Sequence, residues 1–166
     1  GLQLILSRQI RIGDYVRISA GEEGKVADIN FRFTTVQTLG GNTIIVPNQK
    51  LASSVLTNYN MPAQEISVSI PVGVSYASDL DEVERVTLEV ADEVMEAFDH
   101  GVESDPVVRF HTFGDSAIEF DVVLRTSSFV NQFLLKHEFI KALTRRYREE
   151  GIDIPFPMRT IVQAKE

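Results

Sequence analysis

Hydrophobic and polar residues alternate in short runs over the first third of the chain, which is the pattern of half-buried β-strands. The sequence "GGN" at residues 40–42 separates two of these runs, and such residues accept the positive φ of a tight hairpin turn, so Gly40 and Gly41 are expected turn residues. The runs predict strands at residues 14–19, 25–31, 33–39, 43–47 and 54–60. They form a small all-β unit, and a unit of this size is expected to need packing against another domain or subunit for stability.

The hydrophobic period changes after residue 61. Residues 65–72 alternate as a strand, and residues 78–98 carry apolar side chains at steps of three and four, which predicts a helix with Ser78 as its N-cap. Two further strands, at 107–113 and 117–126, precede a second helix at about 129–150 that Gly151 closes. Its expected buried stripe consists of Val130, Phe133, Leu134, Ile140, Leu143 and Tyr147. The order β-α-β-β-α is most of a ferredoxin-like split βαβ unit.

The end of the chain reads as a separate strand. The prolines of "IPFP" (154–157) interrupt the pattern, and Thr160, Ile161 and Val162 lie in the β-rich run that follows. An isolated strand needs a partner for its backbone groups, which is either another chain or an edge of its own domain. The predicted fold class is α+β, with a five-stranded β-domain of the Sm-like barrel type, a ferredoxin-like α/β domain and a C-terminal strand. The predicted domains are residues 1–11, 12–60, 61–158 and 159–166.

Charge is distributed unevenly along the 166 residues, whose formal net charge is −8. Residues 1–60 hold six Lys/Arg and four Asp/Glu (net +2), whereas residues 61–166 hold ten and twenty (net −10). An acidic half is a poor partner for phosphate backbones, so the composition disfavours nucleic acid as a ligand.

Candidate catalytic chemistry is sparse. The chain has no cysteine, which excludes disulfides, thiolate zinc sites and cysteine nucleophiles. His100, His111 and His137 fall on a loop, a strand and a helix without metal-ligand spacing, and no serine sits in a G-x-S-x-G elbow. The many acids of the first helix are read as a solvated face. We therefore expect no enzyme activity, no cofactor and no metal.

The N-terminal residues resemble the end of a membrane segment. No run reaches the roughly 18–20 apolar residues that cross a bilayer. However, "LQLILS" (2–7) leads directly into Arg8 and Arg11. Basic residues commonly follow a membrane helix on its cytoplasmic side, although an ordinary short amphipathic segment has the same composition.

The stretch "NTIIVPNQKLASS" (42–54) changes abruptly from apolar to polar. Pro47 ends a buried strand, and Asn48 and Gln49 follow it at once. This change indicates either a plain turn or a point of contact with another element.

Several strings together resemble the cytoplasmic region of the small-conductance mechanosensitive channel (MscS) family. They are "RIGDYVRI" (11–18), "GKVADINFRFTTVQTLGGNTIIVPNQKLASSVLTNYN" (24–60), "VGVSYASDLDEV" (72–83) and "IDIPFPMRTI" (152–161). The resemblance implies a homo-heptamer in the cell (inner) membrane that passes ions and small solutes when the membrane is under tension. This region would form its cytoplasmic cage, anchored through helices N-terminal to it.

The resemblance also implies roles for individual residues. Asn48 and Gln49 match positions where the β-domain faces the pore helix and couples to the gate, and Arg8 and Arg11 match the junction of that helix with the β-domain. Thr160, Ile161 and Val162 match the strand that joins subunits in a small barrel. Gln9 and Gln49 depart from the family pattern, which leaves the junction geometry and inactivation open. The alternative function is a nucleic-acid- or metabolite-binding module on the same two folds.

Overall fold

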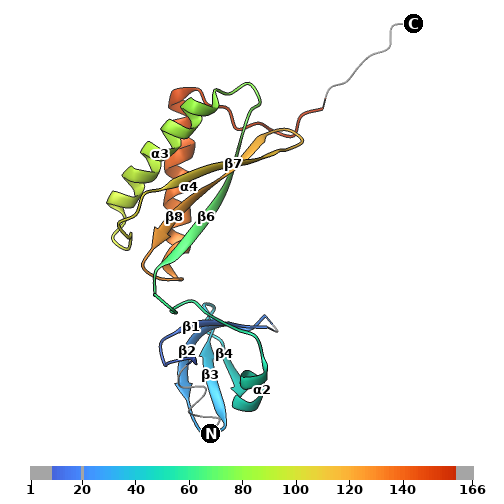
Figure 1. Ribbon diagram of the computed structural model, residues 1–166, viewed down its shortest axis with the longest axis vertical. Helices are drawn as coiled ribbons and strands as arrows, with labels where there is room; N and C mark the ends of the chain where they lie inside the picture. The colour runs from blue at the N-terminus through green and yellow to red at the C-terminus, as the bar shows by residue number, and fades with distance from the viewer. Residues whose placement is uncertain (1–8, 20, 160–166) are drawn as a thin grey trace, which may run out of the picture. The chain divides into compact units, whose positions relative to one another are not determined.

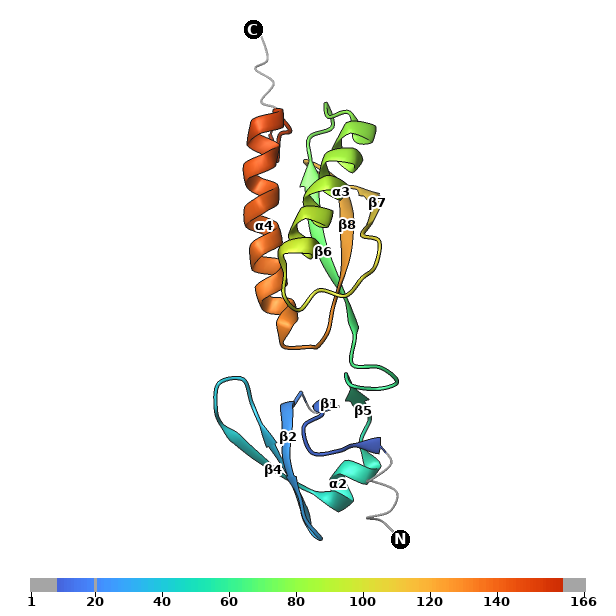
Figure 2. The ribbon, with the colours of Figure 1, turned by 90° about the vertical axis from the view of Figure 1, so that its left-hand side faces the viewer.

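A computed structural model of the chain describes residues 9–19 and 21–159. The chain divides into two compact units, one that ends at Ile66 and one that begins at Ser67. Figures 1 and 2 label the elements of each unit. Each unit contains a sheet of its own.

Over its described residues, the first unit contains a five-stranded antiparallel sheet and the short helix α2. Its hydrogen-bonded order is β4-β3-β2-β1-β5. The predicted number of strands is confirmed, whereas closure into a barrel is not seen, because β4 and β5 are the two ends of this order among the described strands. Its elements are β1 (Tyr15–Ile18), β2 (Glu23–Ile29), β3 (Phe33–Gln37), β4 (Thr43–Pro47), α2 (Asn48–Ser53) and β5 (Leu56–Asn58).

Strand alternation builds the core of this unit. Alternate residues of a strand point to the same face, and one face of the sheet carries the apolar members. Gly24 lets β2 and β3 approach closely, since a Cβ there would lie 2.3 Å from the carbonyl oxygen of Gln37. The buried cluster consists of Ile10, Val16, Ile18, Val26, Val36, Val46 and Leu51.

The β3–β4 connection is a tight hairpin. Gly41 adopts a φ of 86°, a left-handed conformation that costs glycine little. The turn is closed by hydrogen bonds from the Thr38 amide to the Asn42 carbonyl (2.8 Å) and from the Gly41 amide to the Thr38 carbonyl (3.0 Å). The strand register Gln37↔Thr43 follows directly from this short connection.

The second unit is a three-stranded sheet whose one face is covered by two helices (Figure 2). The strand order is β6-β8-β7. This order and the connectivity β-α-β-β-α confirm the ferredoxin-like prediction for these elements. They are β6 (Ile66–Val74), α3 (Leu80–Ala97), β7 (Val107–Phe113), β8 (Ile118–Thr126) and α4 (Asn131–Glu150).

A side-chain cap fixes the start of α3, and a glycine backbone conformation fixes the end of α4. The Asp79 carboxylate, and not the predicted Ser78, caps α3 by accepting hydrogen bonds from the amides of Asp81 (3.0 Å) and Glu82 (3.3 Å). A carboxylate at this end also interacts favourably with the helix dipole. Gly151 ends α4 as predicted, with a φ of 71°.

The predicted buried stripe of α4 is wrong for four of its six residues. Leu143 and Tyr147 are buried, but Val130, Phe133, Leu134 and Ile140 are exposed. The helix instead buries a residue at every fourth position, because this row faces the sheet and α3. The buried residues are Leu135, Phe139, Leu143 and Tyr147.

One polar contact joins the two helices inside this core. The hydroxyl groups of Thr87 and Tyr147 share a hydrogen bond, and the Thr87 hydroxyl also reaches the Val83 carbonyl. Burial raises the pKa of Tyr147 to about 12, and the bond with Thr87 acts in the opposite direction. A buried hydroxyl without such a partner would destabilise the core.

Two phenylalanines of α4 give a matched test of this packing. Phe139→Ala should lower the free energy of unfolding of the second unit by about 3–5 kcal/mol, because its side chain is fully buried. Phe133→Ala, at a side chain that is 50% exposed, should cost less than about 1 kcal/mol. Urea unfolding of the chain measures both values. Equal losses would contradict this assignment of the helix faces.

Tyr147 should also make the second unit sensitive to alkali. Its folded pKa lies above the ordinary value of 10, so its contribution is complete below pH 10 and is lost as the pH rises towards 12. The Tyr147→Phe variant should therefore lose stability less steeply over this interval, by up to about 1.4 kcal/mol per pH unit. Urea midpoints between pH 9 and 11 test this expectation, and parallel slopes for both proteins would refute it.

Candidate functional site

The candidate site is the corner where β4 ends and α2 begins. Pro47 is the last residue of β4, lies opposite Phe33 in the ladder and occupies the N-cap position of α2 with a φ of −58°. A proline donates no backbone hydrogen bond, so the pairing ends here without an unsatisfied amide. The sequence pattern predicted this stop but missed the short helix that follows it.

Asn48 is an internal clamp of this corner. It is only 4% exposed, and its side chain accepts a hydrogen bond from the Thr34 hydroxyl (2.8 Å) and donates one to the Asn30 carbonyl (2.8 Å). Its backbone amide donates to the Arg32 carbonyl at 2.8 Å. The turn between β2 and β3 is thereby tied to the start of α2. These bonds also satisfy Thr34, which is buried.

The remaining polar residues of α2 face outward or tie the helix locally. Gln49 is exposed. The Lys50 ammonium lies 3.6 Å from the Glu22 carboxylate, next to the β1–β2 turn. The hydroxyl groups of Ser53 (3.0 Å) and Ser54 (2.7 Å) donate to the Lys50 carbonyl and so fix the end of the helix. Of the two residues predicted to face a partner, only Gln49 has an accessible side chain.

Exposed apolar side chains surround the same corner. Phe31, in the turn that Asn48 holds, Phe33, opposite Pro47, and Ile45, opposite Thr35, are all exposed. Together they form what we call the corner patch: Phe31, Phe33 and Ile45. Exposed apolar groups gathered in one place are typical of an interaction surface. Strand alternation could have identified Phe33 and Ile45 from the sequence, but not Phe31, which lies in a turn where residues 31–33 are all exposed.

Gln9, the first described residue, is hydrogen-bonded to β5. The Asn58 side-chain amide donates to the Gln9 carbonyl (2.8 Å) and to the Asp14 carboxylate (2.8 Å). The Arg11 amide donates to the same carboxylate at 2.9 Å. Arg11 is exposed, and Arg8 lies outside the described residues. Asp14 and Asn58, which the sequence analysis missed, are far apart in the chain and hold residues 9–11 in place.

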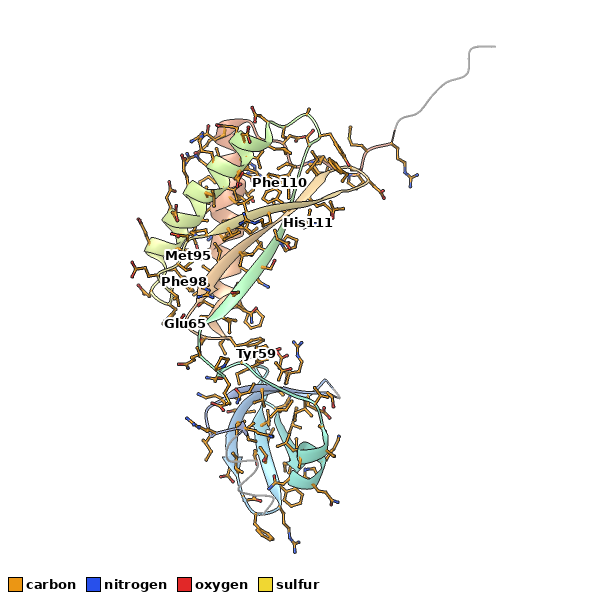
Figure 3. All side chains as sticks on the ribbon, viewed as in Figure 1. Tyr59, Glu65, Met95, Phe98, Phe110 and His111 are labelled. Atoms are coloured by element: carbon orange, nitrogen blue, oxygen red, sulfur yellow. The ribbon has the colours of Figure 1, made fainter. Side chains whose placement is uncertain are left out.

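Charged and aromatic groups meet on the β1 side of this unit. Arg17 pairs with Glu23 at 2.5 Å and lies over the Tyr59 ring, 5.8 Å from its centre. Tyr59 is labelled in Figure 3. Tyr15 donates to the same carboxylate, and burial, followed by that bond, raises the pKa of Tyr15 to about 12. The cluster ties β1 to β2 and has the character of a structural network.

The histidines do not converge. His111 lies on β7 (Figure 3), 3.8 Å from the Asp121 carboxylate, while His100 follows α3 and His137 is on α4. Over the described residues, no group of three His, Asp or Glu side chains is arranged to hold a metal ion. None of the helices in this part of the chain has the length and apolar character needed to cross a bilayer.

Comparison with known proteins identifies both units. Residues 1–61 match the family described as the mechanosensitive ion channel beta-domain, and residues 68–154 match the mechanosensitive ion channel MscS C-terminal family. The chain is 30% identical over 161 residues to an MscS family protein of Synechocystis, covering 97% of this chain and 52% of that protein. It is 32% identical over 124 residues to the mechanosensitive channel MscK of Escherichia coli, covering 75% and 11%.

Solved structures share the fold. The closed-state structure of Helicobacter pylori MscS superimposes with a TM-score of 0.80 at 24% identity, covering 98% of this chain and 62% of that one. Arabidopsis thaliana MSL1 gives a TM-score of 0.66 at 18% identity, covering 93% and 56%. The chain spans about half the length of curated relatives such as the Synechocystis and Archaeoglobus fulgidus proteins.

The clamp predicts unequal effects for two adjacent residues. Asn48→Ala should lower the free energy of unfolding of the first unit by about 1–3 kcal/mol, because Thr34 and the Asn30 carbonyl lose their partner. Gln49→Ala should change it by less than about 0.5 kcal/mol, because the side chain is exposed. Thermal unfolding compares the two variants. A larger loss for Gln49→Ala would overturn this view of the corner.

Proposed function

The chain belongs to the mechanosensitive ion channel MscS family, and from this membership we propose that it forms the cytoplasmic cage region of a tension-gated channel. The observation that carries the proposal is the pair of family matches, which cover residues 1–61 and 68–154 in one order. The resemblance noted in the sequence motifs leads to the same family. The region serves a channel and not an enzyme.

The proposed assembly is a homo-heptamer in the cell (inner) membrane. Helices N-terminal to this chain anchor it and line the pore, and this region lies on the cytoplasmic side. Residues 1–11 are the inner end of the pore helix, residues 12–60 the β-domain and residues 61–158 the α/β domain. Residues 159–166 form the inter-subunit barrel strand; Thr160, Ile161 and Val162, assigned to it, lie outside the described residues.

Permeation and gating belong to different parts of this assembly. Membrane tension favours the wider state of the pore, and ions and small osmolytes then pass through it. The acidic second part of the chain, with ten Lys/Arg and twenty Asp/Glu over residues 61–166, biases the local ion concentration within the vestibule.

The corner between β4 and α2 is proposed to couple the β-domain to the pore helix. Gln49 contributes an accessible side chain, and Asn48 acts indirectly by holding the Asn30–Arg32 turn in place. The corner patch supports this role, since exposed apolar side chains on β3, β4 and the turn held by Asn48 suit an apolar helix as their partner. Arg11 and Arg8 are assigned to the junction between that helix and the β-domain.

Electrophysiology tests the proposed function directly. The full-length protein, expressed in bacteria that lack their own mechanosensitive channels, should give currents that open with suction on a membrane patch. It should also raise survival after a rapid fall in external osmolarity. Absence of tension-activated currents, while the protein is demonstrably present in the membrane, would overturn the proposal.

Gln49 gives a sharper test of coupling. Gln49→Gly should change the rate of closing or inactivation under sustained tension, because it removes the accessible side chain of the corner. Gln64→Gly is a matched control, since Gln64 is also exposed but lies in the connection before β6. Single-channel conductance should stay unchanged in both variants. If the two current traces match that of the unaltered protein, the corner has no coupling role.

A further inference from the structure

Among the described strands, none lies beside β6 on the outer side of the sheet of the second unit. The order β6-β8-β7 leaves β6 at one edge and β7 at the other. A complete split βαβ unit places its last strand next to its first, which here is β6. We call the outer side of Ile66–Val74 the open edge. Its backbone groups need a partner wherever water is excluded.

The described part of the chain's own terminal segment approaches this edge and then leaves it. The Ser75 amide, just after β6, donates to the Asp153 carbonyl at 3.0 Å. Pro155 and Pro157 cannot donate further ladder hydrogen bonds. The Met158 amide instead donates to the Ser116 hydroxyl (3.1 Å), in the turn between β7 and β8. Residues 153–158 therefore do not cover the open edge.

Helix α4, which covers the sheet on the side of this edge, carries exposed apolar side chains. Phe133 and Ile140 lie seven residues apart and so on one flank of α4, and they are 50% and 52% exposed. The side of α4 that faces α3 carries Ala142, which is about 160° around the helix from Ile140. Ile140 therefore lies on the side of α4 that faces away from α3. Figure 2 shows α4 on the β6 side of the helix layer. We call Phe133 and Ile140 the α4 flank.

The opposite edge of the same sheet offers a complementary surface. β7 is the other edge strand, and α3 packs over it. Phe113, at its end, is 82% exposed and stacks on Tyr76, with ring centres 6.4 Å apart. Among the described strands, each edge thus lacks a neighbouring strand on its outer side and lies near exposed apolar side chains.

The charges of the two helices favour the same pairing. α3 carries seven acidic residues and one basic residue (net −6), whereas α4 carries five basic and three acidic residues (net +2). Within the chain, Arg146 of α4 already contacts Glu89 (2.7 Å) and Glu93 (3.5 Å) of α3. A neighbour joined at the opposite edges would place its acidic α3 beside this basic α4 and repeat that chemistry.

We propose that the open edge and the α4 flank of one copy bind the β7 edge of a second copy of this chain. The contact joins two different surfaces, so it is head-to-tail and propagates around a ring. Addition of a strand at a sheet edge supplies the missing main-chain hydrogen bonds. The inference rests on the proposed oligomeric channel and assigns one of its subunit interfaces.

Disulfide cross-linking tests the contact, because the chain has no cysteine of its own. Double variants combine Ser67→Cys or Ser69→Cys on β6 with Arg109→Cys or His111→Cys on β7, all at exposed positions. Within one copy β8 separates these strands, by about 9–10 Å, so a disulfide forms only between copies. The experiment uses membranes containing the full-length protein, oxidised and run on denaturing gels.

At least one double variant should give a ladder that reaches the full oligomer, while each single variant stays monomeric. Ser69→Cys with Asp92→Cys, exposed on α3, is the control pair and should give no ladder. Replacing Phe133 and Ile140 with Ser should reduce the cross-linked fraction by about tenfold. Leu134→Ser, similarly exposed on α4 but about 100° around the helix from Phe133, is the matched control and should leave it unchanged.

The outcomes separate this inference from the proposed function. If an amine-reactive cross-linker finds the oligomer and tension opens the channel, but no edge pair exceeds the control, the edge contact is wrong and the channel assignment stands. Dimers from Ser69→Cys alone would mean that two β6 edges meet, which also overturns the head-to-tail contact. Absence of any oligomer, together with absence of currents, removes both proposals.

Discussion

Burial of one face of β8 is the constraint on which the second unit depends. β8 is the central strand of its sheet, and Ile118, Phe120, Val122 and Leu124 all point into the helix-covered side. Only two helices laid on that face remove these side chains from water, which fixes the rows of α3 and α4 that turn inward. Thr87 and Tyr147 then have to meet across the helix seam, because neither hydroxyl could be buried without a partner.

The first unit depends on polar bonds to a greater degree. Its buried cluster is small, and the corner between β4 and α2 is held by the side chain of Asn48, which bridges Thr34 and Asn30. Under the proposed coupling role, the surface that carries Gln49 and the corner patch needs a rigid base. The Asn48 clamp provides this rigid base, because its three hydrogen bonds connect β3, the turn between β2 and β3, and the start of α2.

Open sheet edges link the fold to assembly. Among the described residues, each sheet ends in strands that are hydrogen-bonded on one side only. These edge strands are β4 and β5 in the first sheet and β6 and β7 in the second. Isolated proteins usually protect such edges, whereas subunits of a ring can use them as interfaces. In the proposed ring, Phe133 and Ile140 lie where the strand of a neighbouring copy would pack.

The sequence by itself determined the strands, the two long helices, their order and the ferredoxin-like connectivity. A hydrophobic period of two residues marks a strand with one buried face, and a period of three to four marks a helix with one buried face. The short helix α2 has no such period and was missed. Glycine chemistry located the hairpin at Gly41 and the end of α4 at Gly151. The family strings determined the channel family. Tertiary structure alone decided that Asn48 points inward, since its partners Asn30 and Thr34 are brought to it by the strand register. It also decided which row of α4 is buried, because the apolar stripe is wider than the surface that the sheet and α3 cover, and this leaves Phe133 and Ile140 exposed.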